Sequence, residues 1–346
     1  MSIFLRVALL ISLASSAAQS QTLVQFGVLG LFHPREIVLE SVGPQVIAVH
    51  TGDRAIYLNR ERDHRRLSME AIGNQIVIDG MSVGSCVAGA RDEGTVRFRL
   101  SIPGKINRVF EGKLAVTAHR GVLTAVVSME REKAVASIVA SEMSSGAPLE
   151  ALRAQAVVTR SFLAGGARHT DFDFCDTTHC QFLRSPDDVS SQVTEAVAST
   201  RSLILSWRNQ NVAALYSSRC GGRTRSLADV GMDSKAGYPY YSVECKWCRE
   251  HPVRWEKRLD PDTRAPESLN ESARIRYVRQ WGWSALPGSN FSVKREANQV
   301  ILDGRSIGHS LGMCQSGAIG MALSGADFGS ILAYYYPNTE LSQLPE

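Results

Sequence analysis

Between residues 23 and 127 the apolar side chains occur in short β-branched runs or alternate with polar side chains. Gly, Asn, Asp and Pro separate these runs. A two-residue period with breaks of this kind is typical of β-strands. We therefore predict a β-rich N-terminal region, with strands near residues 37–39, 46–49, 76–78, 96–100, 114–116 and 123–127.

The pattern changes near Glu130, beyond which the spacing of apolar residues favours helices. A short helix is predicted over residues 134–143. A second helix is predicted over 148–164, because Pro148 suits a first helical position and glycines at 165 and 166 can end the helix. Further elements are expected as helices over 190–199 and from about 318, and as strands over 203–205, 212–216 and 300–302. Helices and strands without regular alternation indicate an α+β fold.

Composition narrows the class of protein. With 44% hydrophobic and 21% charged residues, the chain can bury the core of one large domain or two. A formal net charge of +4 is far below the positive charge typical of a nucleic-acid-binding protein, so we expect no nucleic-acid partner. The small positive excess mildly favours anionic polymers.

The first twenty residues have the order of a secretory signal. Arg6 is followed by an apolar run over residues 7–14 and then by small residues up to Ser20. The run is too short to span a bilayer comfortably. We therefore expect residues 1–20 to be a cleaved signal peptide, the mature chain to be exported to the periplasm or the cell exterior, and no transmembrane segment to remain.

The densest group of reactive side chains lies in the run from Cys175 to Gln181. Cys175, His179 and Cys180, with His169 upstream, offer the two sulfurs and two nitrogens that suit a tetrahedral zinc ion. A Cys175–Cys180 disulfide is the alternative that export favours. Free thiols are the third possibility, and the spacing does not decide between the three.

Cys245 and Cys248 form a second short motif, with two residues between the thiols. In an exported protein the motif favours a disulfide, either within itself or with Cys220, over metal binding or redox catalysis. The chain holds seven cysteines, and an odd number leaves at least one thiol outside internal disulfides.

Glu142 ends an apolar helical segment, where partial desolvation would raise the pKa of its carboxyl. A carboxyl that holds its proton near neutrality can act as a general acid. The plain alternative is a glutamate that faces solvent at a helix end. Glycosidases with two catalytic carboxylates need a second acid, and the sequence marks none out.

A glycine-rich segment over residues 308–317 lacks the Lys-Ser/Thr ending of a phosphate-binding loop. We expect its glycines instead to allow a close approach of the backbone to a substrate or a neighbouring strand. His309 within it is either a site residue or a packed histidine.

Seven blocks in this order resemble the stage II sporulation protein D family, which includes proteins called amidase enhancers: residues 141–143, 149–157, 159–161, 175–181, 217–222, 308–318 and 334–337. The resemblance covers roughly residues 112–341. It implies a lytic transglycosylase that cleaves peptidoglycan glycan strands, preferably after an amidase has removed their stem peptides. The alternative function that the same family implies is that of a non-catalytic glycan-binding protein that stimulates a cell-wall amidase.

The resemblance also assigns roles to residues. Glu142 matches the catalytic glutamate. The muramic acid 6-hydroxyl supplies the nucleophile, so the reaction needs no second carboxylate. The substrate cleft of the mixed α+β fold would be lined by Arg153, Gln155, Arg160, His309 and Gln315. A structural zinc, not required for the reaction, would be held by His169, Cys175, His179 and Cys180.

The implied organisation has three parts. Residues 1–20 are expected to form the signal peptide, 21–111 a β-rich region that is structural or contacts the wall or a partner, and 112–346 the family's catalytic domain. Ser310, Cys314 and Ser316 depart from the residues more usual in the glycine-rich block. These departures bear on the fit of the substrate, not on the type of reaction.

Overall fold

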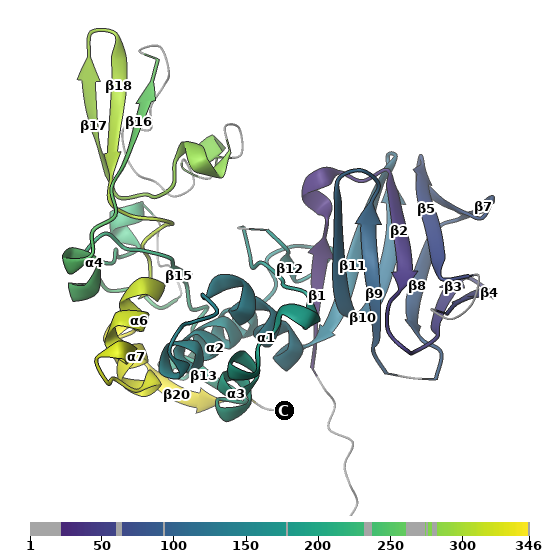
Figure 1. The fold of residues 1–346 in the computed structure, drawn as a ribbon, viewed down its shortest axis with the longest axis horizontal. Helices are drawn as coiled ribbons and strands as arrows, with labels where there is room; N and C mark the ends of the chain where they lie inside the picture. The colour runs from purple at the N-terminus through teal and green to yellow at the C-terminus, as the bar shows by residue number, and fades with distance from the viewer. Residues whose placement is uncertain are drawn as a thin grey trace, which may run out of the picture.

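The structure, a computed structural model, describes residues 22–59, 64–92, 94–177, 179–231, 237–260, 274, 276–278 and 282–344. The signal peptide predicted over residues 1–20 lies outside these residues. Within them, no helix combines the length and the apolar composition that a membrane crossing requires. Figure 1 shows a β-rich region at one end, helices at the centre and a small sheet that projects from the helical part. This mixture confirms the predicted α+β class.

The N-terminal strands alternate buried and exposed residues, as their sequence period predicts. In β9 every second residue from Val96 to Ile102 is buried, and β11 follows the same alternation. Each predicted strand of this region overlaps an observed one. The strands are β1 (Leu23–Val28), β2 (Glu36–Ser41), β3 (Ile47–Thr51), β4 (Arg54–Leu58), β5 (Arg66–Ile72), β6 (Gln75–Ile78), β7 (Met81–Val83), β8 (Ser85–Ala90), β9 (Val96–Ile102), β10 (Ile106–His119) and β11 (Val122–Glu130), with a short 3₁₀ turn η1 (Gly30–Phe32) after β1.

The long strand β10 joins the two halves of this region. Its residues 106–112 pair with β9, whereas residues 113–119 pair with β11 and, over 114–117, with β8. Gly112 lies at the change of partners, where a Cβ atom would stand 2.3 Å from the carbonyl oxygen of Ser128. The domain boundary predicted between residues 111 and 112 therefore falls inside one continuous strand.

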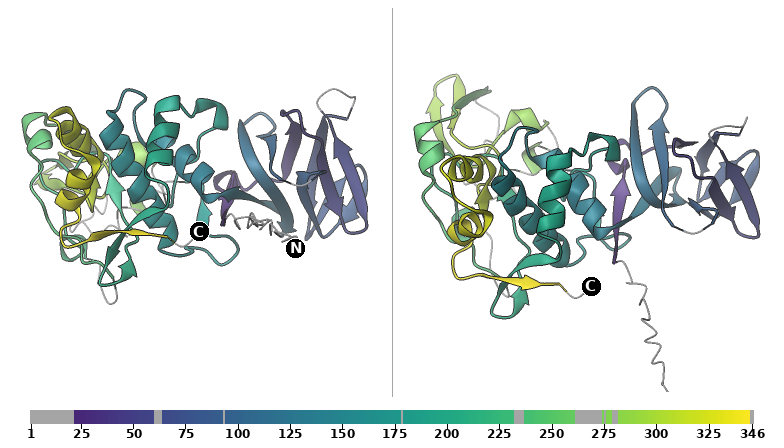
Figure 2. Two further views of the ribbon diagram at one scale, coloured as in Figure 1. Left: turned by 90° about the horizontal axis from the view of Figure 1, so that it is seen from below. Right: turned by 60° about the horizontal axis from the view of Figure 1, so that its bottom comes forward.

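Helix α2 (Leu149–Ala164) is the centre of the second part. It contacts α1 (Arg131–Glu142), α3 (Ser191–Ser199), α6 (Gln315–Leu323), α7 (Phe328–Tyr335) and β13 (Leu203–Trp207). From Ala151 to Leu163 all its residues except Arg153 are buried. Figure 2 shows the other helices around it. The helices predicted over 134–143, 148–164 and 190–199 and from about 318 are thus confirmed within a few residues.

The β-rich region and the helices share one continuous core. The ring of Phe26, on β1, lies 5.9 Å from that of Phe174, which lies 5.5 Å from that of Phe162 on α2. Phe174 belongs to the short strand β12 (Phe174–Cys175), which pairs parallel with β1. These contacts fix the segment around Cys175 against both parts of the molecule.

The strand predicted over residues 212–216 does not form. Val212 and Ala214 are buried in the second hydrophobic core, but the preceding strand ends at Asn211 and the next begins at Tyr216. The predictions for 203–205 and 300–302 are confirmed. The remaining elements are β14 (Gln210–Asn211), β15 (Tyr216–Ser217), α4 (Lys246–Glu250), β16 (Trp255–Leu259), β17 (Phe291–Glu296), β18 (Gln299–Gly304), β19 (Met313–Cys314) and β20 (Glu340–Gln343), with turns η2 (Pro186–Asp188), η3 (Ala228–Val230) and η4 (Trp283–Ala285).

Candidate active site

Glu142 is the last residue of α1 and is half-buried. It lies four residues beyond Ile138, so the two side chains share a face of the helix, and Ile138 and Val139 are fully buried. Burial raises the pKa of the Glu142 carboxyl to about 6, although a hydrogen bond from the backbone N–H of Phe182 partly opposes the shift. The structure thus gives this carboxyl the environment that the sequence suggested.

Two buried glutamines fix the end of α1. The side-chain amide of Gln315 donates to the backbone carbonyl of Glu142 at 3.0 Å and to the side-chain oxygen of Gln155 at 3.2 Å. Gln155 in turn donates to the hydroxyl of Thr159 at 3.2 Å. Two of the predicted cleft residues, Gln155 and Gln315, are therefore brought together beside Glu142.

Tyr216 and Gln181 complete this neighbourhood, and sequence reasoning did not single them out. The Tyr216 hydroxyl donates a hydrogen bond to the side-chain oxygen of Gln181. The pKa of Tyr216 is raised, chiefly by burial and further by the nearby charge of Glu142. The only signal in the sequence was position, since Gln181 ends the cysteine-rich run and Tyr216 directly precedes a family-like block.

His169, Cys175, His179 and Cys180 converge, as predicted, with one potential ligand atom each and all four atoms within 4.8 Å of one another. A nitrogen of His169 lies 3.3 Å from the Cys180 sulfur, and Nδ1 of His179 lies 3.3 Å from Cys180 and 3.7 Å from Cys175. All seven cysteines are free, which argues against the Cys175–Cys180 disulfide. Two sulfurs and two nitrogens at these separations fit a tetrahedral zinc ion.

The loop with these four residues is anchored to the β-rich region through Asp176. The backbone N–H of Asp176 donates to Gly27 at 3.1 Å, and its buried carboxylate accepts from the N–H of Leu29 at 3.3 Å. The same carboxylate pairs with Arg108 of β10 at 3.0 Å. The loop then continues directly into Gln181 and Phe182, so its geometry sets the groups that surround Glu142.

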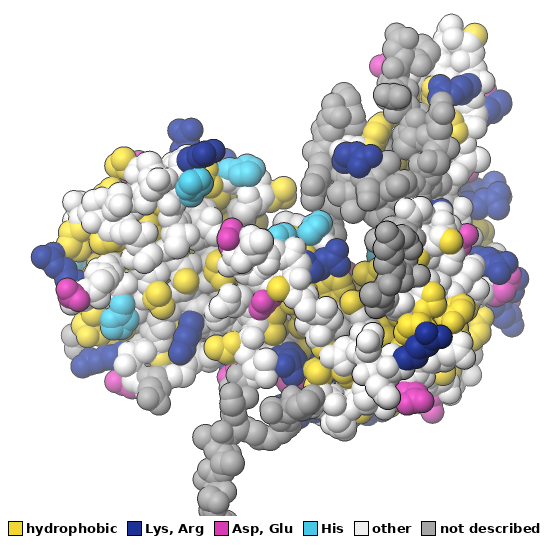
Figure 3. Space-filling model, turned by 180° about the vertical axis from the view of Figure 1, so that it is seen from behind, with side chains coloured by type: hydrophobic (Ala, Val, Ile, Leu, Met, Phe, Trp, Pro, Cys, Tyr) yellow, Lys and Arg dark blue, Asp and Glu magenta, His cyan; other side chains and the backbone are white. Residues whose placement is uncertain are grey.

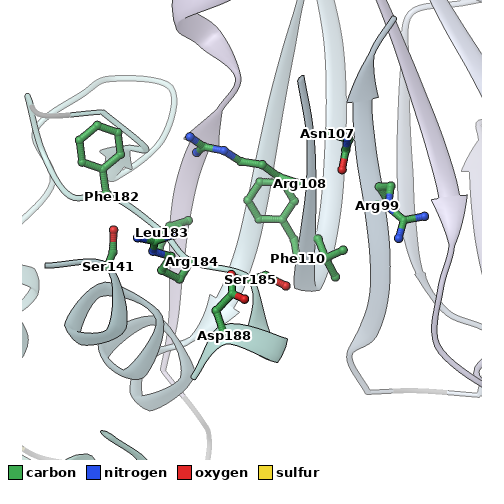
Figure 4. A pocket seen from close by; sticks show the side chains of 11 residues that line it. Arg99, Asn107, Arg108, Phe110, Ser141, Phe182, Leu183, Arg184, Ser185 and Asp188 are labelled. Atoms are coloured by element: carbon green, nitrogen blue, oxygen red, sulfur yellow. The ribbon is translucent and has the colours of Figure 1, made fainter. Parts of the chain in front are cut away.

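A cavity of about 550 Å³ opens between β10 and the end of α1. Figure 4 shows Arg108 extending from β10 toward the segment that carries Phe182, with Ser141 at the helix end. From behind, the molecular surface is hollowed between the β-rich region and the projecting part (Figure 3). The cavity is lined by Arg99, Asn107, Arg108, Val109, Phe110, Ser141, Phe182, Leu183, Arg184, Ser185 and Asp188.

The structure places the two predicted cleft arginines elsewhere. Arg160 is fully buried and forms a two-pronged ion pair with Glu132, at the opposite end of α1 from Glu142, with N–O distances of 2.8 and 2.7 Å. Arg153 pairs with Glu150 and donates to Ser199 at 3.0 Å. We therefore assign both arginines to the packing of the helices.

His309 is half-buried in the glycine-rich segment, where its Nδ1 accepts from the backbone N–H of Leu311 at 3.0 Å. This contact shapes the local turn, in which Ser310 adopts a left-handed backbone with φ 63°. The hydrogen bonds around Glu142 described above do not include His309.

Comparison with known proteins gives an independent view of the chain. Residues 119–207 match the family model described as stage II sporulation protein. An uncharacterized protein of Brachyspira hyodysenteriae is 27% identical over 267 residues, which are 67% of this chain and 72% of that protein. The stage II sporulation protein D of Bacillus subtilis is 24% identical over 274 residues, which are 66% of this chain and 79% of that protein.

A second Bacillus subtilis protein, called amidase enhancer, is 21% identical over 287 residues, which are 59% of this chain but 40% of that protein. The matched family segment contains Glu142, both predicted arginines and all four members of the Cys/His group. The family match over residues 119–207 and these relatives together support the similarity to the stage II sporulation protein D family that the sequence motifs indicated.

Proposed function

We propose that the protein is a lytic transglycosylase of peptidoglycan glycan strands, with Glu142 as both acid and base. The observation that carries the proposal is the half-buried Glu142, whose pKa is raised to about 6 and whose neighbour Ser141 lines a cavity of about 550 Å³. Its acid form is therefore populated near neutral pH, next to a space in which a sugar chain can lie.

In the proposed reaction the Glu142 carboxyl gives its proton to the glycosidic oxygen, and the bond from that oxygen to the anomeric carbon breaks. The 6-hydroxyl of the same muramic acid forms a bond to the anomeric carbon and returns a proton to the Glu142 carboxylate. No water is consumed and the enzyme ends in its starting protonation state. The side chains arranged beside Glu142 are three amides and a phenol, which suits a mechanism with one carboxylate.

The Cys/His group would hold a structural zinc ion, which supplies a fixed cross-link between His169 and the Cys175–Cys180 loop. The proposed proton transfer depends on side chains and backbone groups of the protein. Phe182 donates its backbone N–H to the Glu142 carboxylate and Gln181 orients the Tyr216 hydroxyl. A rigid loop keeps both groups in place during proton transfer.

Activity should fall as the pH rises through about 6. The acid form of Glu142 starts the reaction, and its pKa of about 6 means that this form is lost above that pH. We expect the alkaline limb of kcat/KM to titrate one proton near pH 6, whereas an ordinary glutamate would place it near 4.5. Initial rates on soluble glycan strands from pH 4 to 9 measure the limb. A limb near 4.5 would contradict a desolvated acid.

The cavity charge favours strands that have lost their peptides. Removal of the stem peptide frees the lactyl carboxylate of each muramic acid, and arginine is well suited to bind carboxylates. Of the three arginines that line the cavity, Arg99 pairs with Glu40 at 2.8 Å and Arg108 with Asp176 at 3.0 Å, whereas Arg184 is exposed. Arg184 is the side chain best placed to receive such a carboxylate.

The change Arg184→Ala should raise KM for peptide-stripped strands by about fivefold to twentyfold, the loss of one partly exposed charged contact of about 1–2 kcal/mol. It should have little effect on strands whose lactyl carboxylates have been converted to amides. Arg208→Ala, at an exposed arginine in the turn between β13 and β14, is the matched control. Equal loss on both kinds of strand would argue against recognition of the carboxylate.

The alternative function is binding of glycan to stimulate a cell-wall amidase, which the similarity to an amidase enhancer favours. That role requires no carboxyl acid, so the raised pKa of Glu142 would then have no purpose. Either role needs export to the compartment that holds the wall, as residues 1–20 predict. Purified protein that releases no anhydro-muramic ends, yet speeds an added amidase, would establish the alternative.

A further inference from the structure

A second group of potential metal ligands includes Cys314, which directly precedes Gln315 in the chain. Cys220, Cys245, Cys248 and Cys314 are all buried and free, and their four sulfur atoms lie within 4.8 Å of one another. The Cys248 and Cys314 sulfurs are 3.5 Å apart. The sequence pointed to a disulfide within the Cys245–Cys248 motif or with Cys220, and it did not bring Cys314 into the group.

Three distant segments deliver these thiols. Cys220 follows β15, Cys245 and Cys248 lie at the start of and within α4, and Cys314 ends β19 at the start of α6. The Cys314 sulfur accepts hydrogen bonds from the backbone N–H groups of Cys220 and Gly317, both at 3.4 Å. Such N–H donors stabilise the negative charge of a thiolate, the form in which cysteine binds a metal.

The start of α6 lies so close to Cys245 and Tyr335 that residue 317 has no room for a side chain. A Cβ atom at Gly317 would stand 2.7 Å from the Cys245 sulfur and 1.9 Å from the Tyr335 hydroxyl. The Tyr335 hydroxyl itself lies 3.5 Å from the Cys245 sulfur. Glycine at 317 thus lets α6 begin directly against the four cysteines.

We propose that Cys220, Cys245, Cys248 and Cys314 bind one zinc ion as a tetrathiolate. Zinc–sulfur bonds of about 2.3 Å in a tetrahedron place the sulfurs about 3.8 Å apart, in keeping with four sulfurs inside 4.8 Å. A disulfide needs about 2.05 Å between its sulfurs, and a cluster of several irons spreads its ligand sulfurs farther apart than a single ion does. The four-sulfur set selects zinc over harder metals.

The proposed ion has a structural consequence for the site around Glu142. Cys314 directly precedes Gln315, whose amide bonds to the Glu142 carbonyl at 3.0 Å. The tetrathiolate would therefore brace one side of the site, while the Cys/His loop braces the other through Phe182. It also accounts for the odd number of cysteines, because Cys86 alone remains, buried 3.6 Å from the Met69 sulfur.

The test is the zinc content and thiol count of the full chain, purified without chelator or reductant. The double variant Cys175→Ser/Cys180→Ser lacks the first site and should still carry one zinc per chain by elemental analysis. Adding Cys248→Ser should remove that zinc. Cys86→Ser, at the one buried cysteine outside both groups of ligands, is the matched control and should keep the zinc content of the wild type.

A measurement on the wild type covers the case in which the variants do not fold. Unfolded with chelator and without reductant, it should expose seven reactive thiols, whereas one disulfide among the four cysteines would leave five and two would leave three. A count of five or three overturns the proposal. So does a folded Cys175→Ser/Cys180→Ser variant that carries no zinc, or a wild type with seven thiols whose native mass shows no bound metal.

Discussion

The variant Glu142→Gln should lose about 100- to 10,000-fold in kcat on peptide-stripped glycan strands, the range that general acid–base catalysis supplies. The amide keeps the size of the side chain but has no proton to give and no charge with which to recover one. Binding of the strand should persist, because the carboxyl contributes mainly in the transition state. Release of soluble fragments measures kcat, and equilibrium binding to the same strands measures affinity.

The matched control for this change is Glu195→Gln on α3, where the side chain is 59% exposed and its contact with Arg153 is 3.7 Å long. It makes the same chemical change away from the cavity and should leave kcat within about twofold. Thermal unfolding should show that both variants are folded. Equal activity of Glu142→Gln and wild type would remove Glu142 from the mechanism.

The second large effect is expected from loss of the Cys/His metal site. Cys180→Ser removes the sulfur that lies within 3.3 Å of both His169 and His179, so zinc should be lost. An ion present at about a thousand times its Kd stabilises the folded chain by about 4 kcal/mol, and the unfolding free energy should fall by that amount. The activity should fall with it, because Gln181 and Phe182 lose their anchor.

A chelator separates loss of the metal from other effects of the substitution. It should remove both proposed ions from the wild type but only the tetrathiolate ion from Cys180→Ser, so the wild type should lose about 4 kcal/mol more than Cys180→Ser, as followed by denaturant unfolding with and without chelator. Cys86→Ser, which touches neither group of metal ligands, should respond as the wild type does. A wild type whose stability does not depend on chelator would contradict a structural ion at this loop.

Local patterns in the sequence predicted the elements well because local physics decides them. The alternation from Val96 to Ile102 follows from one face of β9 facing the core. The end of the second helix at Ala164 follows from the glycines behind it. By contrast, residues 212–215 looked like a strand because they are apolar, but Val212 and Ala214 are buried in the core without pairing to another strand.

The candidate site was predictable in part. The Cys/His group was recognisable because two cysteines and two histidines are unusual at that spacing, whereas Glu142 was singled out by the resemblance to the family. Arg160 was predicted to line the cleft but is buried in an ion pair with Glu132. The sequence did not reveal this pair because Glu132 lies 28 residues away, on another helix. The contact between Cys220 and Cys314 was harder still to predict, because the two residues are 94 positions apart in the sequence. Contacts at such separations depend on how the elements pack, which no local pattern records.

The central claim is that cleavage uses the substrate's own 6-hydroxyl and no water. Digestion of peptide-stripped strands in water enriched in ¹⁸O, followed by mass spectrometry of the fragments, tests it most directly. The account predicts 1,6-anhydro-muramic ends without ¹⁸O, made by the wild type and not by Glu142→Gln. New reducing ends that carry ¹⁸O, or no new ends at all, would contradict it.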